Sequence, residues 1–274
     1  MVKLGILKMG ALGSAVLLEY LFDERADREN IEVRVVTSGA KMGEGETKVA
    51  EELKNFNPDI CIVVSPNATL PGPSKAREAL RANGKPVIVI SDSPTKKIKD
   101  ELKERGFGYI LVTADSMIGA RREFLDSSEM ALFNSDVIRV LSATGAFRAI
   151  QNEIDRVLNE IKEGEYPLLP QIVLNAEKAV NAGNFQNPYA KAKAMAAYFI
   201  AEKVAEVDVK GCFMEKNPEK YIPLVASAHE MMRKAARLAD EAREIEKGND
   251  TVFRTPHSKD GKTLSKTGLL EKPA

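Results

Sequence analysis

The sequence predicts an α/β protein: a doubly wound, mainly parallel, five-stranded sheet, followed by a helix bundle and a small C-terminal β segment. Three observations carry this prediction. Short apolar runs alternate with helical patterns over the first 113 residues, a glycine turn follows the first run, and later residues recur at helical spacing. Such alternation implies right-handed β–α–β crossovers and a parallel sheet. The expected domains are 1–117, 118–248 and 249–274.

The elements of the first domain are predicted from the spacing of apolar residues and from the residues that interrupt it. Apolar runs bounded by glycine, proline, serine or aspartate predict five strands, and amphipathic stretches between them predict helices. The strands are expected at 2–8, 31–37, 59–65, 86–91 and 108–113, and the helices near 14–23, 47–55, 74–82 and 95–105.

The second domain shows three apolar stripes at spacings of three and four, as one face of a helix requires. The first runs from Met130 to Ile161, the second from Ala190 to Val204 and the third from Leu224 to Ile245. Gly145 interrupts the first stripe and predicts close packing or a bend. Alanine-rich stripes predict a tight bundle and a subunit interface. In the last segment, the turn pair Asp260-Gly261 predicts a β ribbon over 255–264.

Composition excludes several classes of function. Lysine plus arginine equals aspartate plus glutamate, so the formal net charge is zero, which gives no indication of nucleic acid or membrane binding. No apolar run is long enough to span a bilayer. Cys61 and Cys212 lie far apart, as expected for reduced packing residues in a cytoplasmic chain. With two histidines, a histidine-rich metal site is excluded.

The first turn begins a Rossmann-like ligand site. Ligands of doubly wound sheets bind beyond the carboxyl ends of the strands, where glycines admit close approach and helix starts offer N–H groups. The turn lacks the G-x-G-x-x-G pattern, and no carboxylate follows strand 31–37 to hold a ribose, which argues against NAD. The alternative is an ordinary strand-to-helix turn. The coenzyme-binding candidates on these loops are Gly10, Gly13, Ser14, Ser38, Gly39, Asn67, Gly72 and Asp92.

A second group of polar residues is predicted to bind substrate. It consists of Asp115, Met117, Arg121, Arg122, Asn187, Tyr189 and His229. Arginines near a cleft edge recognise phosphate or carboxylate groups. Each candidate has a structural alternative: helix capping for the aspartates and Asn187, surface ion pairs for the arginines, and a hydrogen-bonded packing role for His229. No Ser-His-Asp, H-E-x-x-H or Walker A pattern is visible.

Several long runs carry a resemblance to a known family. They are Ser65-Pro66-Asn67, Pro71 to Glu78, Gly108 to Val112, Asp115 to Asp126, Asn187 to Ala190, Lys193 to Ala197, Val225 to Ala236 and Arg254 to His257. Over essentially its whole length the chain resembles the coenzyme F-420-dependent methylenetetrahydromethanopterin dehydrogenases of archaea. One departure is Ala11, which stands where the family usually has asparagine.

The resemblance implies a function and an assembly. It implies reversible hydride transfer between methylenetetrahydromethanopterin and the deazaflavin coenzyme F-420, a dissociable co-substrate, with no metal and no flavin. No side chain is then indispensable to catalysis, and Asp115 and His229 are candidates for orienting the reactants. The family also implies a homo-oligomer, a hexamer built as a trimer of dimers. Two other functions stay open: a small-molecule-binding oligomeric scaffold or sensor, and an NADP-dependent oxidoreductase.

Overall fold

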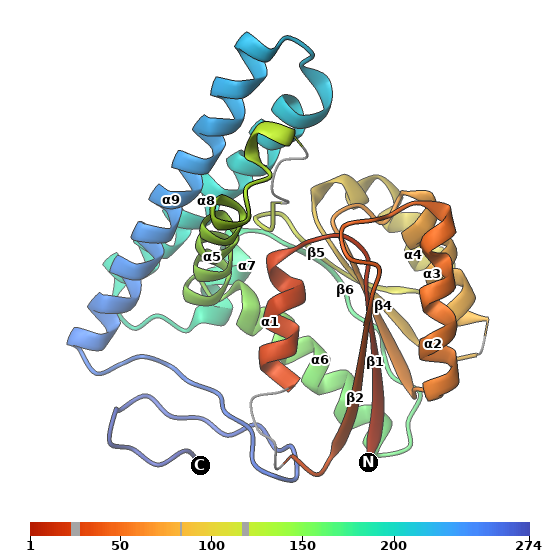
Figure 1. The fold of residues 1–274 in the computed structure, drawn as a ribbon. Helices are drawn as coiled ribbons and strands as arrows, with labels where there is room; N and C mark the ends of the chain where they lie inside the picture. Colours follow the sequence, from red (N-terminus) through yellow and green to blue (C-terminus); the bar gives the residue numbers. More distant parts are fainter. Residues whose placement is uncertain (23–27, 83, 117–120) are drawn as a thin grey trace. The chain divides into compact units, whose positions relative to one another are not determined.

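A computed structural model describes residues 1–22, 28–82, 84–116 and 121–274, and confirms the α/β class (Figure 1). Its sheet has six strands in the order β2-β1-β3-β4-β5-β6. The strands are β1 (Val2–Lys8), β2 (Ile31–Thr37), β3 (Ile60–Ser65), β4 (Val87–Ser91), β5 (Gly108–Val112) and β6 (Gln171–Leu174). β1 pairs in parallel with both β2 and β3, and β4 lies in parallel between β3 and β5. The five strands expected from the sequence are all present.

The sixth strand was not expected. It has only four residues and follows Pro170, so it shows neither the length nor the alternation that marks a strand. Its backbone bonds advance in step with β5, with Tyr109 N–H donating to Pro170 O and Thr113 N–H donating to Leu174 O, as in a parallel pair.

Helices cover both faces of the sheet (Figure 1). On one face α2 (Val49–Phe56), α3 (Pro71–Arg81) and α4 (Lys99–Glu104) contribute to a buried core that includes Leu53 and Leu80. Alternate strand residues such as Leu7 and Val63 point into that core, because successive side chains of a strand point to opposite faces. α1 (Gly13–Phe22) and α6 (Ala146–Lys162) lie on the other face. The 3-10 turns η1 (Glu44–Lys48) and η2 (Ser93–Ile98) precede α2 and α4.

The strand order predicts the position of a ligand site in the sheet unit. β1 connects outward to β2 on one side, whereas β3 lies on the other side of β1 and leads on to β4 and β5. The order therefore reverses between β1 and β3, and open α/β sheets bind ligands in the crevice beyond the carboxyl ends of the strands at such a point.

Packing divides the described chain into two compact units that do not follow chain order. The sheet unit comprises Met1–Val112, Ile150–Val173 and Thr255–Leu264, and the bundle unit comprises Thr113–Ala149, Leu174–Arg254 and Ser265–Ala274. The sequence analysis placed boundaries after residues 117 and 248. The units differ from those domains because most of α6 and the segment 255–264 group with the sheet.

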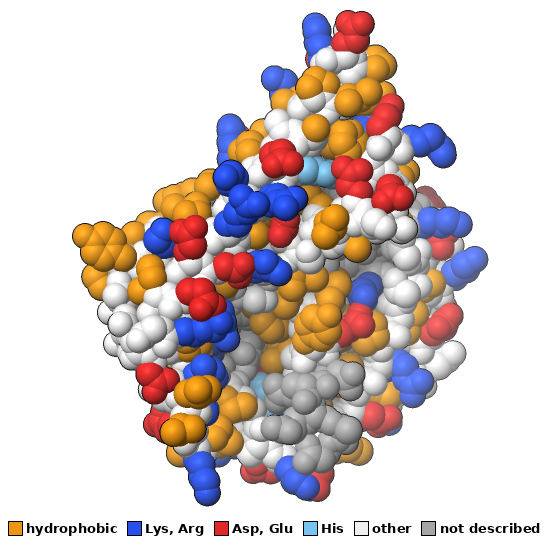
Figure 2. Space-filling model, turned by 60° about the vertical axis from the view of Figure 1, so that its left-hand side comes forward, with side chains coloured by type: hydrophobic (Ala, Val, Ile, Leu, Met, Phe, Trp, Pro, Cys, Tyr) orange, Lys and Arg blue, Asp and Glu red, His pale blue; other side chains and the backbone are white. Residues whose placement is uncertain are grey.

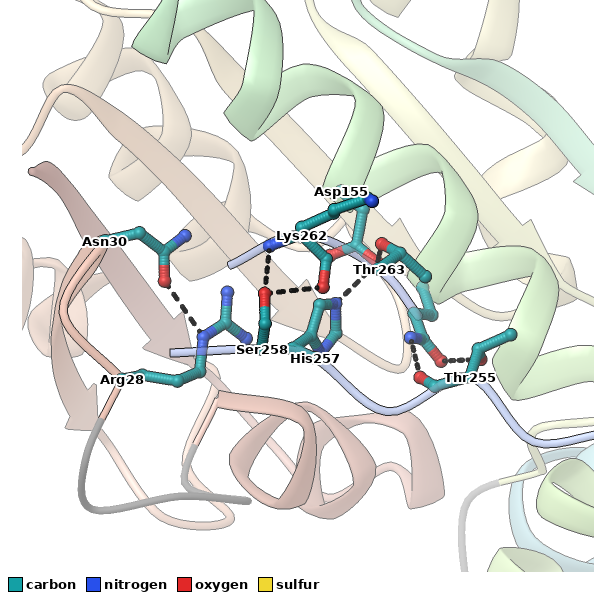
Figure 3. A network of polar contacts seen from close by, with 9 residues as sticks. Arg28, Asn30, Asp155, Thr255, His257, Ser258, Lys262 and Thr263 are labelled. Carbon is teal, nitrogen blue, oxygen red and sulfur yellow. Dashed lines mark hydrogen bonds and ion pairs between the residues drawn. The ribbon is translucent and has the colours of Figure 1, made fainter. Parts of the chain in front are cut away.

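The segment 255–264 is anchored on α6 by polar contacts (Figure 3). His257 Nε2 lies 2.8 Å from Asp155 Oδ2, and the Gln151 side-chain amide donates to Thr255 O. The segment turns at Asp260-Gly261, and His257 pairs antiparallel with Thr263. The expected ribbon is thus present as isolated bridges, with no regular strand over the described residues there.

The bundle unit is built from α5 (Ser127–Ala143), α7 (Ala176–Gly183), α8 (Pro188–Val209) and α9 (Pro218–Gly248), with the 3-10 turn η3 (Arg122–Phe124) and the π-helical turn η4 (Lys210–Met214). Every member of the alanine stripe of α8 is buried. On α9 the buried line runs through Val225, Ala228, Met232, Ala235, Ala239 and Ala242, so the expected stripe is rotated by about one residue. No helix in the described ranges is long and apolar enough to cross a membrane.

The expected long helix over 130–161 is wrong. α5 ends at Ala143 and α6 begins at Ala146, because Gly145 has φ +93° and cannot continue a right-handed helix. A Cβ at Gly145 would lie 2.3 Å from Ala179 O and 2.4 Å from Gly183 N. The expectation of close packing at Gly145 is confirmed.

Candidate active site

The loops after β1, β2 and β3 meet at the carboxyl edge of the sheet unit. Gly10 has φ +91°, and its N–H donates to Gly39 O at 2.8 Å. A Cβ at Gly10 would lie 2.7 Å from Pro66 Cδ and 2.8 Å from Met42 Sδ. The structure therefore brings the first three predicted loops into direct contact, at the point where the strand order reverses.

The other glycines of this edge have structural roles of their own. A Cβ at Gly72 would lie 2.5 Å from Met42 O, so Gly72 lets α3 pack against the loop after β2. Gly39 has φ +64°, and its N–H donates to Thr37 Oγ1 at 2.9 Å. Ser38 donates from its hydroxyl to Lys41 O at 2.6 Å. These contacts explain the residue types without a ligand, and they also hold the loop backbone in place for one.

Asn67 and Asp92 cap the turns that follow β3 and β4. Asn67 Oδ1 accepts bonds from the Thr69 N–H at 3.0 Å and the Thr69 hydroxyl at 2.6 Å. Asp92 is 4% exposed and accepts a bond from the Ser93 N–H. Their capping role is what loop chemistry alone provides. Gly13 and Ser14 open α1 and are buried.

Arg121 occupies a fixed position in the bundle unit. Its guanidinium stacks on the Tyr221 ring, 3.9 Å from the centroid, and donates to Gly211 O and Glu215 O at the two ends of η4. The Tyr221 hydroxyl donates to Glu123 Oε1 at 2.8 Å, and the pKa of Glu123 is lowered by a hydrogen bond from its own backbone and by this bond from Tyr221. The contacts of Arg121 among the described residues therefore hold the backbone of η4 in place.

His229 lies in an aromatic pocket of the same unit. Its ring centroid is 5.1 Å from that of Phe124 and 4.6 Å from that of Phe133, and Nδ1 is 3.4 Å from Glu129 Oε1. Burial lowers the pKa of His229, although Glu129 partly opposes the shift. The ring is therefore neutral at pH 7. Nε2 is buried and has no hydrogen-bond partner among residues the structure describes.

The predicted substrate residues do not form one cluster. Asn187 caps α8 and accepts the Tyr189 N–H at 2.9 Å, and Tyr189 itself is 77% exposed. Arg121 contacts Gly211, just beyond the other end of the same helix. A helix of 22 residues is about 33 Å long, so the two groups cannot contact one reacting ring system within a single bundle unit. The two groups thus lie near opposite ends of α8, and the assignment of this set to the substrate stays a prediction.

Three further candidates complete the predicted set. Asp115 is fully buried just beyond β5, and Arg122 is exposed at the start of η3. Met117 lies outside the described residues. Across the described ranges, no three His, Cys, Asp or Glu side chains gather as a metal site requires.

Sequence reasoning missed several buried polar residues. Thr95 and Ser91 are fully buried at the carboxyl edge of the sheet unit, and Arg77 is 2% exposed. Asp208 is 4% exposed, and burial raises its pKa to about 7. One signal was available for Asp208, because it continues the alanine stripe of α8 four residues after Val204. Ser91, Thr95 and Arg77 lie in an ordinary strand end and two ordinary helix patterns, with no local signal of their burial.

Fold and site together define a class of protein: an α/β protein whose first loops meet at the carboxyl edge of a parallel sheet, with a helical second unit. The chain belongs to the methylene-5,6,7,8-tetrahydromethanopterin dehydrogenase family, whose model matches residues 2–274. It is 74% identical over 272 residues to an F-420-dependent methylenetetrahydromethanopterin dehydrogenase from Archaeoglobus fulgidus, covering 99% of both chains. It is 58% identical over 273 residues to one from Methanothermobacter marburgensis, again covering 99% of both.

A solved structure agrees with these relatives. It is an F-420-dependent methylenetetrahydromethanopterin dehydrogenase in complex with methylenetetrahydromethanopterin and coenzyme F-420. The TM-score is 0.96 at 50% identity, and the match covers all of both chains. The family suggested by the sequence runs is confirmed, and this family is one of oxidoreductases.

Proposed function

We propose that this chain catalyses reversible hydride transfer between methylenetetrahydromethanopterin and coenzyme F-420, giving the methenyl product and reduced coenzyme. The observation that carries the proposal is the full-length match, at TM-score 0.96, to a protein solved with both ligands. Relatives with the same named activity are 54–74% identical to this chain over their full length.

The carboxyl edge of the sheet unit supports the coenzyme assignment. The strand order reverses there, which is where open α/β sheets generally bind ligands, and β2 is followed by Ser38 and Gly39, with no carboxylate to hold an adenosine ribose. A deazaflavin coenzyme has no such ribose to bind. We assign coenzyme contacts to Gly10, Gly13, Ser14, Ser38, Gly39, Asn67, Gly72 and Asp92.

The chain's own contribution is binding, orientation and exclusion of water. The bound coenzyme supplies the hydride-accepting chemistry, so the protein needs to hold the two reacting carbons about 3–3.5 Å apart. His229, held between the rings of Phe124 and Phe133, and Arg121, bonded to backbone oxygens of η4, have fixed positions that suit such a role. Asp115, Arg121, Arg122, His229, Asn187, Tyr189 and Met117 are assigned to binding or orienting the pterin, from more than one copy of the chain if all take part.

The assembly is proposed to be a homo-oligomer, a trimer of dimers by resemblance to the family. The bundle unit exposes large apolar side chains, among them Leu132, Tyr189, Phe213 and Met214, each more than half exposed. Aromatic residues and methionine are enriched at protein interfaces relative to the rest of the surface. On the face in Figure 2, acidic and basic side chains are interspersed, which gives no patch of one sign for nucleic acid.

The chain is proposed to work in the cytoplasm. Its two cysteines are free and buried, and burial raises the pKa of Cys61 to about 12, so that thiol is unreactive. Free thiols are ordinary in a reducing compartment.

Hydride transfer is tested with labelled substrate. Methylenetetrahydromethanopterin deuterated at the transferred position is expected to deliver its label to coenzyme F-420 without wash-out into solvent. An absorbance titration of the protein with oxidised coenzyme F-420 checks binding separately. Label appearing in water would contradict direct transfer. Binding of NADP without any response to coenzyme F-420 would favour an NADP-dependent oxidoreductase, and binding without turnover would favour a scaffold or sensor.

A further inference from the structure

The backbone N–H and carbonyl of Ala68, in the turn between β3 and α3, are both held by buried side chains. The Ala68 N–H donates to Thr95 Oγ1 at 2.9 Å, and the Ala68 carbonyl accepts from Arg77 Nη1 at 2.5 Å. Thr95 is 0% exposed and Arg77 is 2% exposed. All three residues belong to the sheet unit, and both bonds are made away from solvent.

The hydroxyl of Thr95 is part of a row of hydrogen bonds in which every donor and acceptor can be assigned. Ser91 Oγ lies 2.6 Å from Thr95 Oγ1 and donates its proton to Ser65 O at 2.6 Å. Since each hydroxyl has one proton to donate, Thr95 must donate to Ser91 and accept from the Ala68 N–H. This row of hydrogen bonds therefore starts and ends on the backbone of residues 65–68, and it passes through the carboxyl end of β4.

Arg77 also holds the backbone of Ala68 in place, at a cost in the free energy of burying its guanidinium. Burial lowers the pKa of Arg77, and the carboxylate nearest to its Nε, that of Glu78, is 3.9 Å away. Nε has no hydrogen-bond partner in the described ranges. Burying a guanidinium costs desolvation free energy, which the Ala68 carbonyl and the Phe107 ring, 5.8 Å from Arg77 Cζ, offset in part. Its position holds the Ala68 carbonyl where the turn requires it.

We propose that Thr95 is a positioning residue for the coenzyme, acting through the turn 66–70. This inference rests on the proposed function. The turn lies beside the point where the strand order reverses, and Pro66 at its start is the residue that a Cβ at Gly10 would strike. Because the Ala68 peptide is fixed before any ligand arrives, binding need not order it, and preorganisation of this kind raises affinity. Fixation acts equally on the ground and transition states, so it changes KM and leaves kcat.

The substitution Thr95→Val tests this, with Thr95→Ser as the conservative variant. Thr95→Val keeps shape and burial but removes the hydroxyl, leaving the Ala68 N–H and the Ser91 hydroxyl without their partner. We expect it to raise the Kd and KM for coenzyme F-420 about tenfold, with kcat and the KM for the pterin changed less than twofold. Thr95→Ser is expected to restore the KM for the coenzyme to within about twofold of the original.

Thr144→Val is the matched control. Thr144 is also 0% exposed, but its hydroxyl donates at 2.7 Å to Val140 O of its own helix in the bundle unit. It is expected to lower Tm without changing the KM for the coenzyme. If Thr95→Val does not fold, Ser91→Ala breaks the same row of hydrogen bonds at its other end and is expected to raise the same KM.

The outcomes separate the two proposals. A variant with lowered Tm and an unchanged Kd for coenzyme F-420 would overturn the positioning role and leave the proposed function intact. A fall in kcat with unchanged Kd would overturn it as well, because Thr95 would then act in the transition state. Absence of coenzyme binding by the unmodified protein would overturn the proposed function, and the positioning role with it.

Discussion

At the carboxyl edge of the sheet unit, the buried hydroxyls of Thr95 and Ser91 each take part in two hydrogen bonds. In the bundle unit, by contrast, neither carboxylate oxygen of the buried Asp208 has a hydrogen-bond partner among the described residues. Neutral groups that satisfy one another fix a backbone at every ordinary pH. An ionisable group without a partner shifts its pKa instead, so its surroundings change stability with pH. The two sites thus solve burial of polar atoms differently: Thr95 and Ser91 fix the backbone of the sheet edge, whereas Asp208 makes stability depend on pH.

The largest effect is expected where backbone packs on backbone in the bundle unit. Gly145→Ala adds a Cβ 2.3 Å from Ala179 O and also imposes a positive φ on an L residue. Overpacking against backbone that cannot move and the positive φ together are expected to lower the free energy of unfolding by about 3 kcal/mol or more. Urea unfolding followed by circular dichroism measures it.

Gly164→Ala separates the two contributions. Gly164 has φ +84°, but a Cβ there meets nothing within 4 Å. Its replacement should therefore cost only the conformational part, about 1 kcal/mol. Equal losses in the two variants would show that close packing at Gly145 contributes nothing.

The next effect concerns Asp208 and depends on pH. Burial raises its pKa from the ordinary 3.8 to about 7, so the folded state keeps a proton that the unfolded state has lost. Stability therefore falls as pH rises from about 4 to about 7 and stays low above that. At 1.36 kcal/mol per pKa unit, the upper bound of the loss is roughly 4 kcal/mol. Asp208→Asn is expected to remove it, raising the free energy of unfolding at pH 8 and changing it little at pH 4.

Asp240→Asn is the control for that experiment. Asp240 forms an exposed ion pair with Arg139 at 3.0 Å, and such pairs contribute at most about 1 kcal/mol. Asp240→Asn is expected to change the free energy of unfolding by no more than that. A stability difference between the original protein and Asp208→Asn that is the same at pH 4 and pH 8 would show that folding does not shift the pKa of Asp208.

The sequence could predict what repeats along the chain. Five strands, the switch to helical period after residue 115 and the alanine stripe of α8 all follow from local patterns, and the structure confirms them. β6 was not predictable because a run of four residues is too short to show a periodic pattern. The break between α5 and α6 was not predictable because a single glycine is tolerated within a helix.

The candidate site was predictable only in part, for a physical reason. The first three loops meet because parallel strands end at one edge, so Gly10 and Gly39 could be grouped from topology alone. Arg121 and Asn187 were grouped by chemistry, but the length of α8 separates them, and no local pattern in the sequence encodes that distance. The roles of Thr95 and Arg77 depend on contacts with Ala68 that lie 27 and 9 residues away along the chain.

The smallest effect is expected at His229, where burial of an ionisable group is only partly compensated. Burial lowers its pKa below the ordinary 6.5, so the unfolded state gains a proton before the folded state as pH falls. Its contribution to stability is therefore present above pH 6.5 and lost as pH falls below it. His229→Phe keeps a ring between Phe124 and Phe133 and removes the buried Nε2 that has no partner in the described chain. It is expected to stabilise the fold by about 1 kcal/mol at pH 8. The gain should increase toward pH 5, because only the original protein must keep a histidine neutral there. Tm measured at pH 5, 6.5 and 8 checks the trend. A variant whose gain shrinks toward pH 5 would mean that Glu129 holds His229 charged in the folded state, and that the bundle unit satisfies this group as fully as the sheet edge satisfies Thr95.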